Sequence, residues 1–305
     1  MMRAPLLLSL VLCLAASLRA APSSSGSSRP RSANWSPASL EESRRLGGQG
    51  YAIAEHASVQ VPEGRLAVVV YRKSGGAPRL GVSLVTDRGQ KLLHMKIGSS
   101  FDIKLASIHK SGSIPDLAGD HSRIVAYQTA LTGVKQESLI LLRYRDGALE
   151  ALPSLPFGRF SDIDRDGTLE IVSRERPLGQ FFMIGCESYM RRAQDAFRTS
   201  IHAFRQGRVV RVSKSYPWYF DNSRQEMLAR LDAIDLRSGE ADPGQYLSVA
   251  LSVYYDYQEM GRAREGWKEF RRLNPARPAD PPPVQRCMKE VELTLRKRLK
   301  IPSDW

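Results

Sequence analysis

Residues 80–96 have the sequence Leu80-Gly-Val-Ser-Leu-Val-Thr86, Asp87-Arg-Gly-Gln90 and Lys91-Leu-Leu-His-Met-Lys96. Two runs rich in aliphatic residues flank a short turn, which is the pattern of a β-hairpin. A second hairpin follows the same plan at residues 138–151, with Asp146 and Gly147 in its turn. Further strand-like runs lie at 66–71, 123–128, 169–173 and 180–184. Short strands with frequent turn signals predict an antiparallel β domain over residues 47–185.

The hydrophobic period changes after residue 186, where apolar residues recur at helical spacing. The first predicted helix places Met190, Ala193, Phe197, Ile201 and Phe204 on one face. Further helices are predicted at 227–234, at 246–260 and 262–273 as a pair interrupted at Gly261, and beyond Pro283 with a stripe of Val284, Met288, Val291, Leu295 and Leu299. We therefore predict an α+β fold, with the antiparallel β region followed by a helical region at 186–305.

The first 21 residues have the layout of a secretory signal peptide. Met1-Met2-Arg3 gives a positive start, and the apolar run from Leu6 to Leu18 is too short to cross a bilayer. Residues 22–46 are rich in Ser, Arg, Pro and Gly, so we expect a flexible leader there. No later stretch reaches the roughly 18 apolar residues of a membrane span. We expect an exported protein, periplasmic or extracellular, with no transmembrane span in the mature chain.

Removal of the signal peptide leaves two cysteines, Cys186 and Cys287. Two thiols in an exported protein favour one disulfide. Such a bond would close a loop of about 100 residues and contribute roughly 4 kcal/mol through loop-closure entropy. Two buried free thiols are the alternative.

The chain has 45 Lys and Arg residues against 32 Asp and Glu residues, a formal net charge of +13. This charge favours an anionic partner or surface, although a solvated basic surface has the same composition. The sequence has no module that interleaves basic and aromatic residues, so we expect no nucleic-acid partner. The expected partner is a protein or an anionic envelope or extracellular polymer.

An acidic loop, Asp162-Ile-Asp164-Arg-Asp166-Gly167-Thr-Leu-Glu170, lies between two predicted strands. Calcium takes oxygen ligands at about 2.3–2.6 Å, and carboxylates at alternate positions of a tight loop can turn toward one ion. Gly167 permits the sharp turn after the third carboxylate. An EF-hand needs a bidentate Glu at loop position twelve. This chain has Ser173 at that position, so we predict a different kind of calcium site.

The stretch Gly158-Arg-Phe-Ser-Asp-Ile-Asp-Arg-Asp-Gly-Thr-Leu-Glu-Ile-Val172 resembles the FG-GAP/VCBS repeat of integrin α-chain propellers and of many exported bacterial proteins. In that family an Asp-x-Asp-x-Asp-Gly-x-x-Asp loop between strands binds calcium. The resemblance covers about residues 105–185 and implies propeller-blade-like hairpins. It implies calcium ligands from the side chains of Asp162, Asp164 and Asp166, the backbone carbonyl of Thr168, and Glu170 in place of the usual Asp.

A degenerate copy of the same stretch begins at Asp116. Ala118 stands in place of the middle carboxylate and His121 in place of the glycine, so we expect no metal there. The spacing between the copies suits one blade. Only two or three such units fit before the predicted helices, whereas a closed propeller needs about four.

Near the C-terminus, over about residues 247–280, a second resemblance involves Tyr257, Gly261, Phe270 and Pro278. Their spacings are similar to those of a tetratricopeptide repeat, with Gly266 where that repeat prefers Ala. A generic helical hairpin gives the same pattern.

The sequence has no Gly-x-Ser-x-Gly elbow, no phosphate-binding Gly-rich loop and no His-Glu-x-x-His motif. We name no catalytic residue and predict an exported, non-enzymatic binding or structural protein with one structural calcium ion. Two alternatives stay open. One is a cell-envelope hydrolase that carries the β region as an accessory module, and the other is a basic protein that adheres to anionic envelope polymers.

Overall fold

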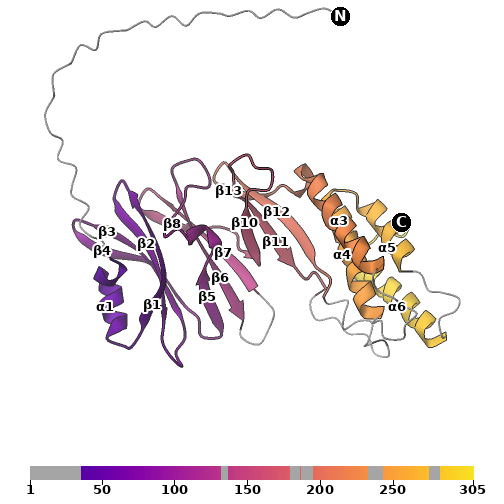
Figure 1. Cartoon of the computed structure of the whole chain (residues 1–305), viewed down its shortest axis with the longest axis horizontal. Coiled ribbons are helices and arrows are strands. Elements are labelled where there is room, and N and C mark those ends of the chain that lie inside the picture. The colour runs from indigo at the N-terminus through magenta and orange to yellow at the C-terminus, as the bar shows by residue number, and fades with distance from the viewer. Residues whose placement is uncertain (1–35, 132–136, 179–185, 187–194, 233–242, 275–281) are drawn as a thin grey trace, which may run out of the picture. The chain divides into compact units, whose positions relative to one another are not determined.

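The computed structural model describes residues 36–131, 137–178, 186, 195–232, 243–274 and 282–305. Its strands form three antiparallel sheets in chain order, and its long helices follow them (Figure 1). This order confirms the predicted α+β fold class. The expected signal peptide and the predicted strand at 180–184 lie outside the described residues.

The first sheet is a four-stranded meander. Its strands are β1 (Ala52–Val61), β2 (Gly64–Arg72), β3 (Arg79–Thr86) and β4 (Gly89–Ile97). The hairpin at residues 80–96 forms β3 and β4, with Thr86 paired to Gly89 at its turn. β2 is buried on both faces, which explains its continuous apolar run.

The helix α1 (Glu41–Gly47) lies beside β1. Its Ser43 hydroxyl is 2.8 Å from the Tyr71 hydroxyl of β2, and both Leu40 and Leu46 are buried. The expectation of a flexible leader is therefore wrong for residues 37–46. Composition indicated disorder there, but Leu40 just before the helix and Leu46 near its end bury enough apolar surface to hold the segment on the sheet.

The second sheet also has its strands in chain order. They are β5 (Phe101–Leu105), β6 (Arg123–Leu131), β7 (Glu137–Arg145) and β8 (Ala148–Ala151), with the short β9 (Leu155–Pro156) paired to β7. Alternate residues of β6 enter two different cores. Val125 and Tyr127 pack with apolar residues of the first sheet, whereas Ile124 and Ala126 pack with those of the third. The second sheet is thus covered on both faces.

The third sheet is formed by β10 (Gly158–Ser161), β11 (Glu170–Glu175), β12 (Arg198–Arg205) and β13 (Arg208–Arg211). The prediction of a helix across Ile201 and Phe204 is wrong, because these residues lie in β12. They occupy opposite faces of the strand, with Ile201 packed on α3 and Phe204 on the second sheet. Gln206 and Gly207 have φ values of +51° and +72° and form the tight turn to β13.

The β region therefore continues to Arg211, so the predicted boundary at residues 185 and 186 is also wrong. Met190 and Ala193, which belong to the same predicted helix, lie outside the described residues.

In the part of the chain that the structure describes, four long helices follow the sheets: α3 (Pro217–Asp232), α4 (Pro243–Glu259), α5 (Ala263–Leu273) and α6 (Pro282–Arg298). They share a core around the buried Trp267 and Phe270. The predicted pair broken at Gly261 corresponds to α4 and α5. At Gly266 these helices approach so closely that a Cβ atom would lie 2.5 Å from Cβ of Tyr257. Short 3₁₀ helices occur at Pro37–Ser39, Ser107–His109 and Ser213–Ser215.

Helices pack on the face of the third sheet that the second sheet leaves uncovered. Ile201 of β12 contacts Phe220 of α3. Ser252 of α4 accepts a hydrogen bond from the Phe197 amide next to β12, and Glu259 pairs with Arg211 of β13. Within the described ranges, no helix is both long and apolar enough to cross a membrane.

Cys186 and Cys287 form a disulfide with a Cα–Cα distance of 5.6 Å. The bond links the segment that follows β11 to α6. It therefore fastens the helical layer to the β region covalently.

Candidate metal centre

The acidic loop connects β10 to β11, the first two strands of the third sheet. Ser161 and Glu170 form the last strand pair before the chain leaves the sheet, so both ends of the loop are fixed by the ladder. Asp162, Asp164 and Asp166 each offer a carboxylate oxygen, and these three oxygens lie within 4.8 Å of one another. The sequence-predicted carboxylates therefore converge on one point.

Each of the three carboxylates also holds the loop backbone. Asp162 Oδ2 accepts the Gly167 amide at 3.1 Å, Asp164 Oδ1 accepts the Asp166 amide at 3.4 Å, and Asp166 Oδ1 accepts the Thr168 amide at 2.7 Å. Gly167 has φ +87°, a conformation that glycine adopts without strain. The loop is consequently shaped by the same side chains that would bind an ion.

The second carboxylate oxygen of Asp162, Oδ1, gives the strongest indication of a bound ion. Asp162 Oδ1 is buried and has no hydrogen-bond partner. A buried polar atom without a partner costs roughly 1–3 kcal/mol, and more when it is charged. A cation bound by Asp162 through Oδ1 would satisfy this oxygen, and the three neighbouring carboxylates fit a metal ion that prefers carboxylate oxygen.

Asp164 and Asp166 are exposed, and Asp162 is half-buried. Hydrogen bonds from the backbone and side chain of Thr168 lower the pKa of the Asp166 carboxyl below its ordinary value. The group is therefore ionised at neutral pH, as a metal ligand must be.

Glu170 lies apart from the group of three. Its side chain is buried, and its Oε2 accepts the Ile163 amide at 3.0 Å. Glu170 thus fixes the start of the loop to its end, and its implied role as a ligand stays a prediction. The same holds for the carbonyl of Thr168.

Sequence reasoning missed the anchor beneath the loop. Ile163 packs with Ile201 of β12, and with Tyr216 and Phe220 at the start of α3. Burial, followed by the negative charges of Glu170 and Asp164, raises the pKa of Tyr216 to about 12. The apolar Ile163 between two aspartates indicates a buried contact, but the residues that it contacts are distant in sequence and could not be identified from it.

The degenerate copy connects β5 to β6 just as the acidic loop connects β10 to β11. Asp116 Oδ2 accepts the His121 amide at 2.8 Å, and Asp120 Oδ1 accepts the Ser122 amide at 3.1 Å. These two bonds match those from Gly167 to Asp162 and from Thr168 to Asp166.

The backbone of the two loops also agrees. Gly119 and His121 have φ values of +66° and +64°, at the positions where Arg165 and Gly167 have +63° and +87°. The copy lacks the middle carboxylate, because Ala118 replaces it, and Arg145 lies 3.9 Å from Asp120. Among the described residues, the convergence of three ligands occurs in the intact loop alone.

No family model, no curated protein and no solved structure matches this chain. The case for a metal centre therefore rests on the geometry of the loop itself.

Of the residues in the second resemblance, Tyr257 lies on α4, Gly261 lies between α4 and α5, and Phe270 lies on α5. Pro278 lies outside the described residues.

Proposed function

We propose that this chain is an exported, non-enzymatic binding or structural protein that holds one structural calcium ion between β10 and β11. The observation that carries the proposal is Asp162, whose buried Oδ1 has no hydrogen-bond partner and whose carboxylate lies close to those of Asp164 and Asp166. Calcium accepts several carboxylate and carbonyl oxygens in a flexible geometry, whereas magnesium demands a strict octahedron and keeps its water. A short loop with three aspartates suits calcium better.

A structural role follows from where the loop is anchored. The ion would tie the β10–β11 connection to the contact of Ile163 with Tyr216 and Phe220. An ion that binds only the folded loop stabilises the protein by about 2.7 kcal/mol at a concentration one hundred times its Kd.

The arrangement of the sheets supports the FG-GAP/VCBS resemblance. Each of the three sheets is a meander whose main strands follow chain order, and the two related loops occupy the same position in the second and third sheets. Three such units do not reach the roughly four blades of a closed propeller. We propose an open array in which α1 covers the first sheet and α3 and α4 cover the third.

Calcium titration of the full chain tests the proposal, with thermal unfolding and calorimetry as readouts. We expect calcium to bind with a stoichiometry of one and to raise the Tm, and a chelator to reverse the rise. Asp164→Ala should abolish both effects, because it removes an exposed ligand that holds the loop by only one long hydrogen bond of 3.4 Å.

Asp87→Ala is the matched control, since Asp87 is an exposed aspartate in the β3–β4 turn. It should respond to calcium as the unmodified chain does. A Tm that ignores both calcium and chelator in the unmodified chain would reject the structural calcium ion.

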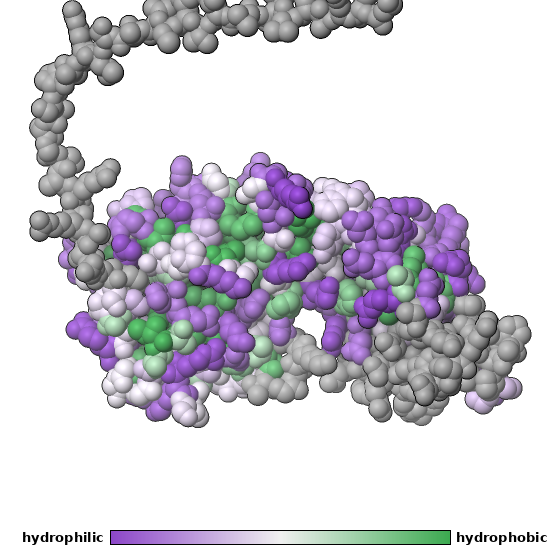
Figure 2. Space-filling view, in the orientation of Figure 1, coloured by the Kyte–Doolittle hydropathy of each residue, from purple (hydrophilic) through white to green (hydrophobic). Residues whose placement is uncertain are grey.

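A second candidate function is adhesion to an anionic polymer, which the net charge of +13 favours. Hydrophilic side chains cover much of the face shown in Figure 2. Retention on an immobilised polyanion should fall steeply as salt rises, because exposed charges more than about 8–10 Å apart are screened at physiological ionic strength. Retention that is absent at low salt, or indifferent to salt, would count against this function.

A further inference from the structure

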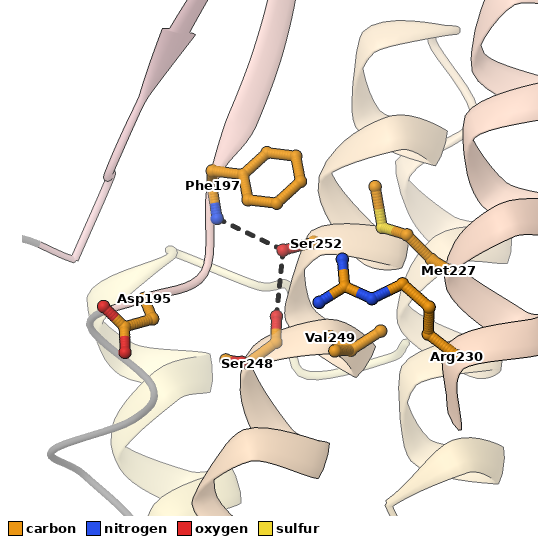
Figure 3. A pocket seen from close by; sticks show the side chains of 7 residues that line it. All are labelled: Asp195, Phe197, Met227, Arg230, Ser248, Val249 and Ser252. Atoms are coloured by element: carbon orange, nitrogen blue, oxygen red, sulfur yellow. Dashed lines mark hydrogen bonds between the residues drawn. The ribbon is translucent and has the colours of Figure 1, made fainter. Parts of the chain in front are cut away.

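A cavity of about 170 Å³ lies where the start of β12 meets α3 and α4 (Figure 3). Its apolar walls come from three elements, with Phe197 next to β12, Met227 on α3 and Val249 on α4. It is separate from the acidic loop, since none of its lining residues belongs to residues 162–170.

The serine hydroxyl at the centre of Figure 3 is already engaged. Ser252 Oγ accepts the Phe197 amide at 3.2 Å and donates to the Ser248 carbonyl at 2.9 Å. These two bonds hold α4 against the start of β12, so they fix the cavity wall.

Arg230 differs from the other polar groups of the cavity. Its guanidinium extends from α3 toward Ser252, into the space between the labelled residues (Figure 3). Among the described residues it makes no ion pair, hydrogen bond or ring contact. Asp195 lies on the opposite side with its carboxylate turned away, and that carboxylate is 3.7 Å from Arg176. The cavity therefore combines one solvent-exposed guanidinium with three apolar side chains.

We propose that this cavity binds a small monocarboxylate, whose carboxylate pairs with Arg230 and whose apolar body contacts Phe197, Met227 and Val249. A guanidinium binds carboxylate through two parallel hydrogen bonds. A cavity of about 150 Å³ accepts a benzene ring, and this one has a similar volume, so it has room for a phenyl or a branched four-carbon group. The carboxylate comes either from a free acid or from the C-terminal residue of a peptide.

Calorimetric or NMR titration of the full chain with isovalerate and benzoate tests the proposal. We expect saturable binding with a Kd on the order of 1 mM, as the small number of ligand atoms allows. Isovaleramide has the same shape without the charge and should bind at least about ten-fold more weakly. The tripeptide Gly-Gly-Val and its C-terminal amide form the second arm, and the tighter of the two carboxylate ligands identifies the source.

Arg230→Gln should weaken carboxylate binding by roughly ten-fold or more while leaving the Tm unchanged, since Arg230 has no partner among the described residues. Arg208→Gln, at an exposed arginine of β13, is the matched control and should bind normally. Three outcomes would overturn the proposal: no saturable binding at about fifty times the expected Kd, equal binding of acid and amide, or full affinity in the Arg230→Gln variant.

Discussion

Asp256 is a carboxylic acid placed where its ionised form is unfavourable. The residue is fully buried on α4, and no hydrogen bond of good geometry reaches either carboxylate oxygen, although the Ser223 side chain lies close enough to affect the pKa. Burial, together with the neighbouring charge of Glu259, raises the pKa of Asp256 to about 7, while the Ser223 side chain and the charges of Arg174 and Arg224 oppose the shift. At neutral pH the carboxyl is therefore close to half protonated, between the third sheet and α3.

This shift sets the sign of a pH dependence. An Asp in the unfolded chain has a pKa of about 3.9, so between roughly pH 4 and pH 7 the folded state holds the extra proton. Stability from this group is present below that window and falls as pH rises through it. We expect the unmodified protein to lose roughly 3 kcal/mol between pH 5 and pH 8 relative to Asp256→Asn.

Urea unfolding of both proteins at the two pH values measures the difference. Asp87→Asn, at an exposed position, serves as the control and should follow the unmodified chain. Parallel pH profiles for the Asp256→Asn variant and the unmodified chain would contradict the expectation.

Among the secondary-structure elements, the hairpins show most clearly what the local sequence predicts and what it does not. The turns at Asp87 to Gln90 and at Asp146-Gly147 were predicted from sequence, because polar and glycine residues separate two apolar runs there. The β12–β13 hairpin was missed, although Gln206-Gly207 has a comparable turn. β12 is buried on both faces, and its apolar residues fall at intervals of three and four, which also fit a helix.

The structure of the candidate metal loop was also predicted only in part. Local spacing predicted that Asp162, Asp164 and Asp166 converge, because the loop itself determines their geometry. The contact of Ile163 with Tyr216 was not predictable, since it depends on how α3 packs on the third sheet.

The degenerate loop can test whether the backbone conformation that the two loops share is sufficient for calcium binding once the third carboxylate is restored. Asp116 and Asp120 already accept the matching amides, so Ala118→Asp restores the missing carboxylate to a shaped loop. We expect the calcium stoichiometry to rise from one to two by calorimetry. The new site should be roughly ten-fold weaker, because Arg145 competes for Asp120. A stoichiometry that stays at one would show that backbone similarity is insufficient.

At the scale of the whole molecule, packing between layers covers the sheets. The second sheet is buried on both faces, and helices cover the outer face of the third. The disulfide between Cys186 and Cys287 adds a covalent link to this packing.

Cys287→Ser should therefore lower the free energy of unfolding by about 2–5 kcal/mol. Reductant should lower it by a similar amount in the unmodified chain and leave the variant unchanged. Denaturant unfolding with and without reductant checks both points. Equal stability of the oxidised and reduced chains would mean that packing alone holds α6 in place.

The same disulfide has a mechanical consequence. Cys186 and Cys287 are 101 positions apart in sequence, and a fully extended chain spans about 3.5 Å per residue. A force that pulls the two ends of the chain apart cannot draw out the roughly 350 Å of contour length between these cysteines. The segment between the two cysteines would stay a closed loop until a reductant cleaved the bond. The maximum length to which the chain can be stretched therefore depends on the redox state of its surroundings.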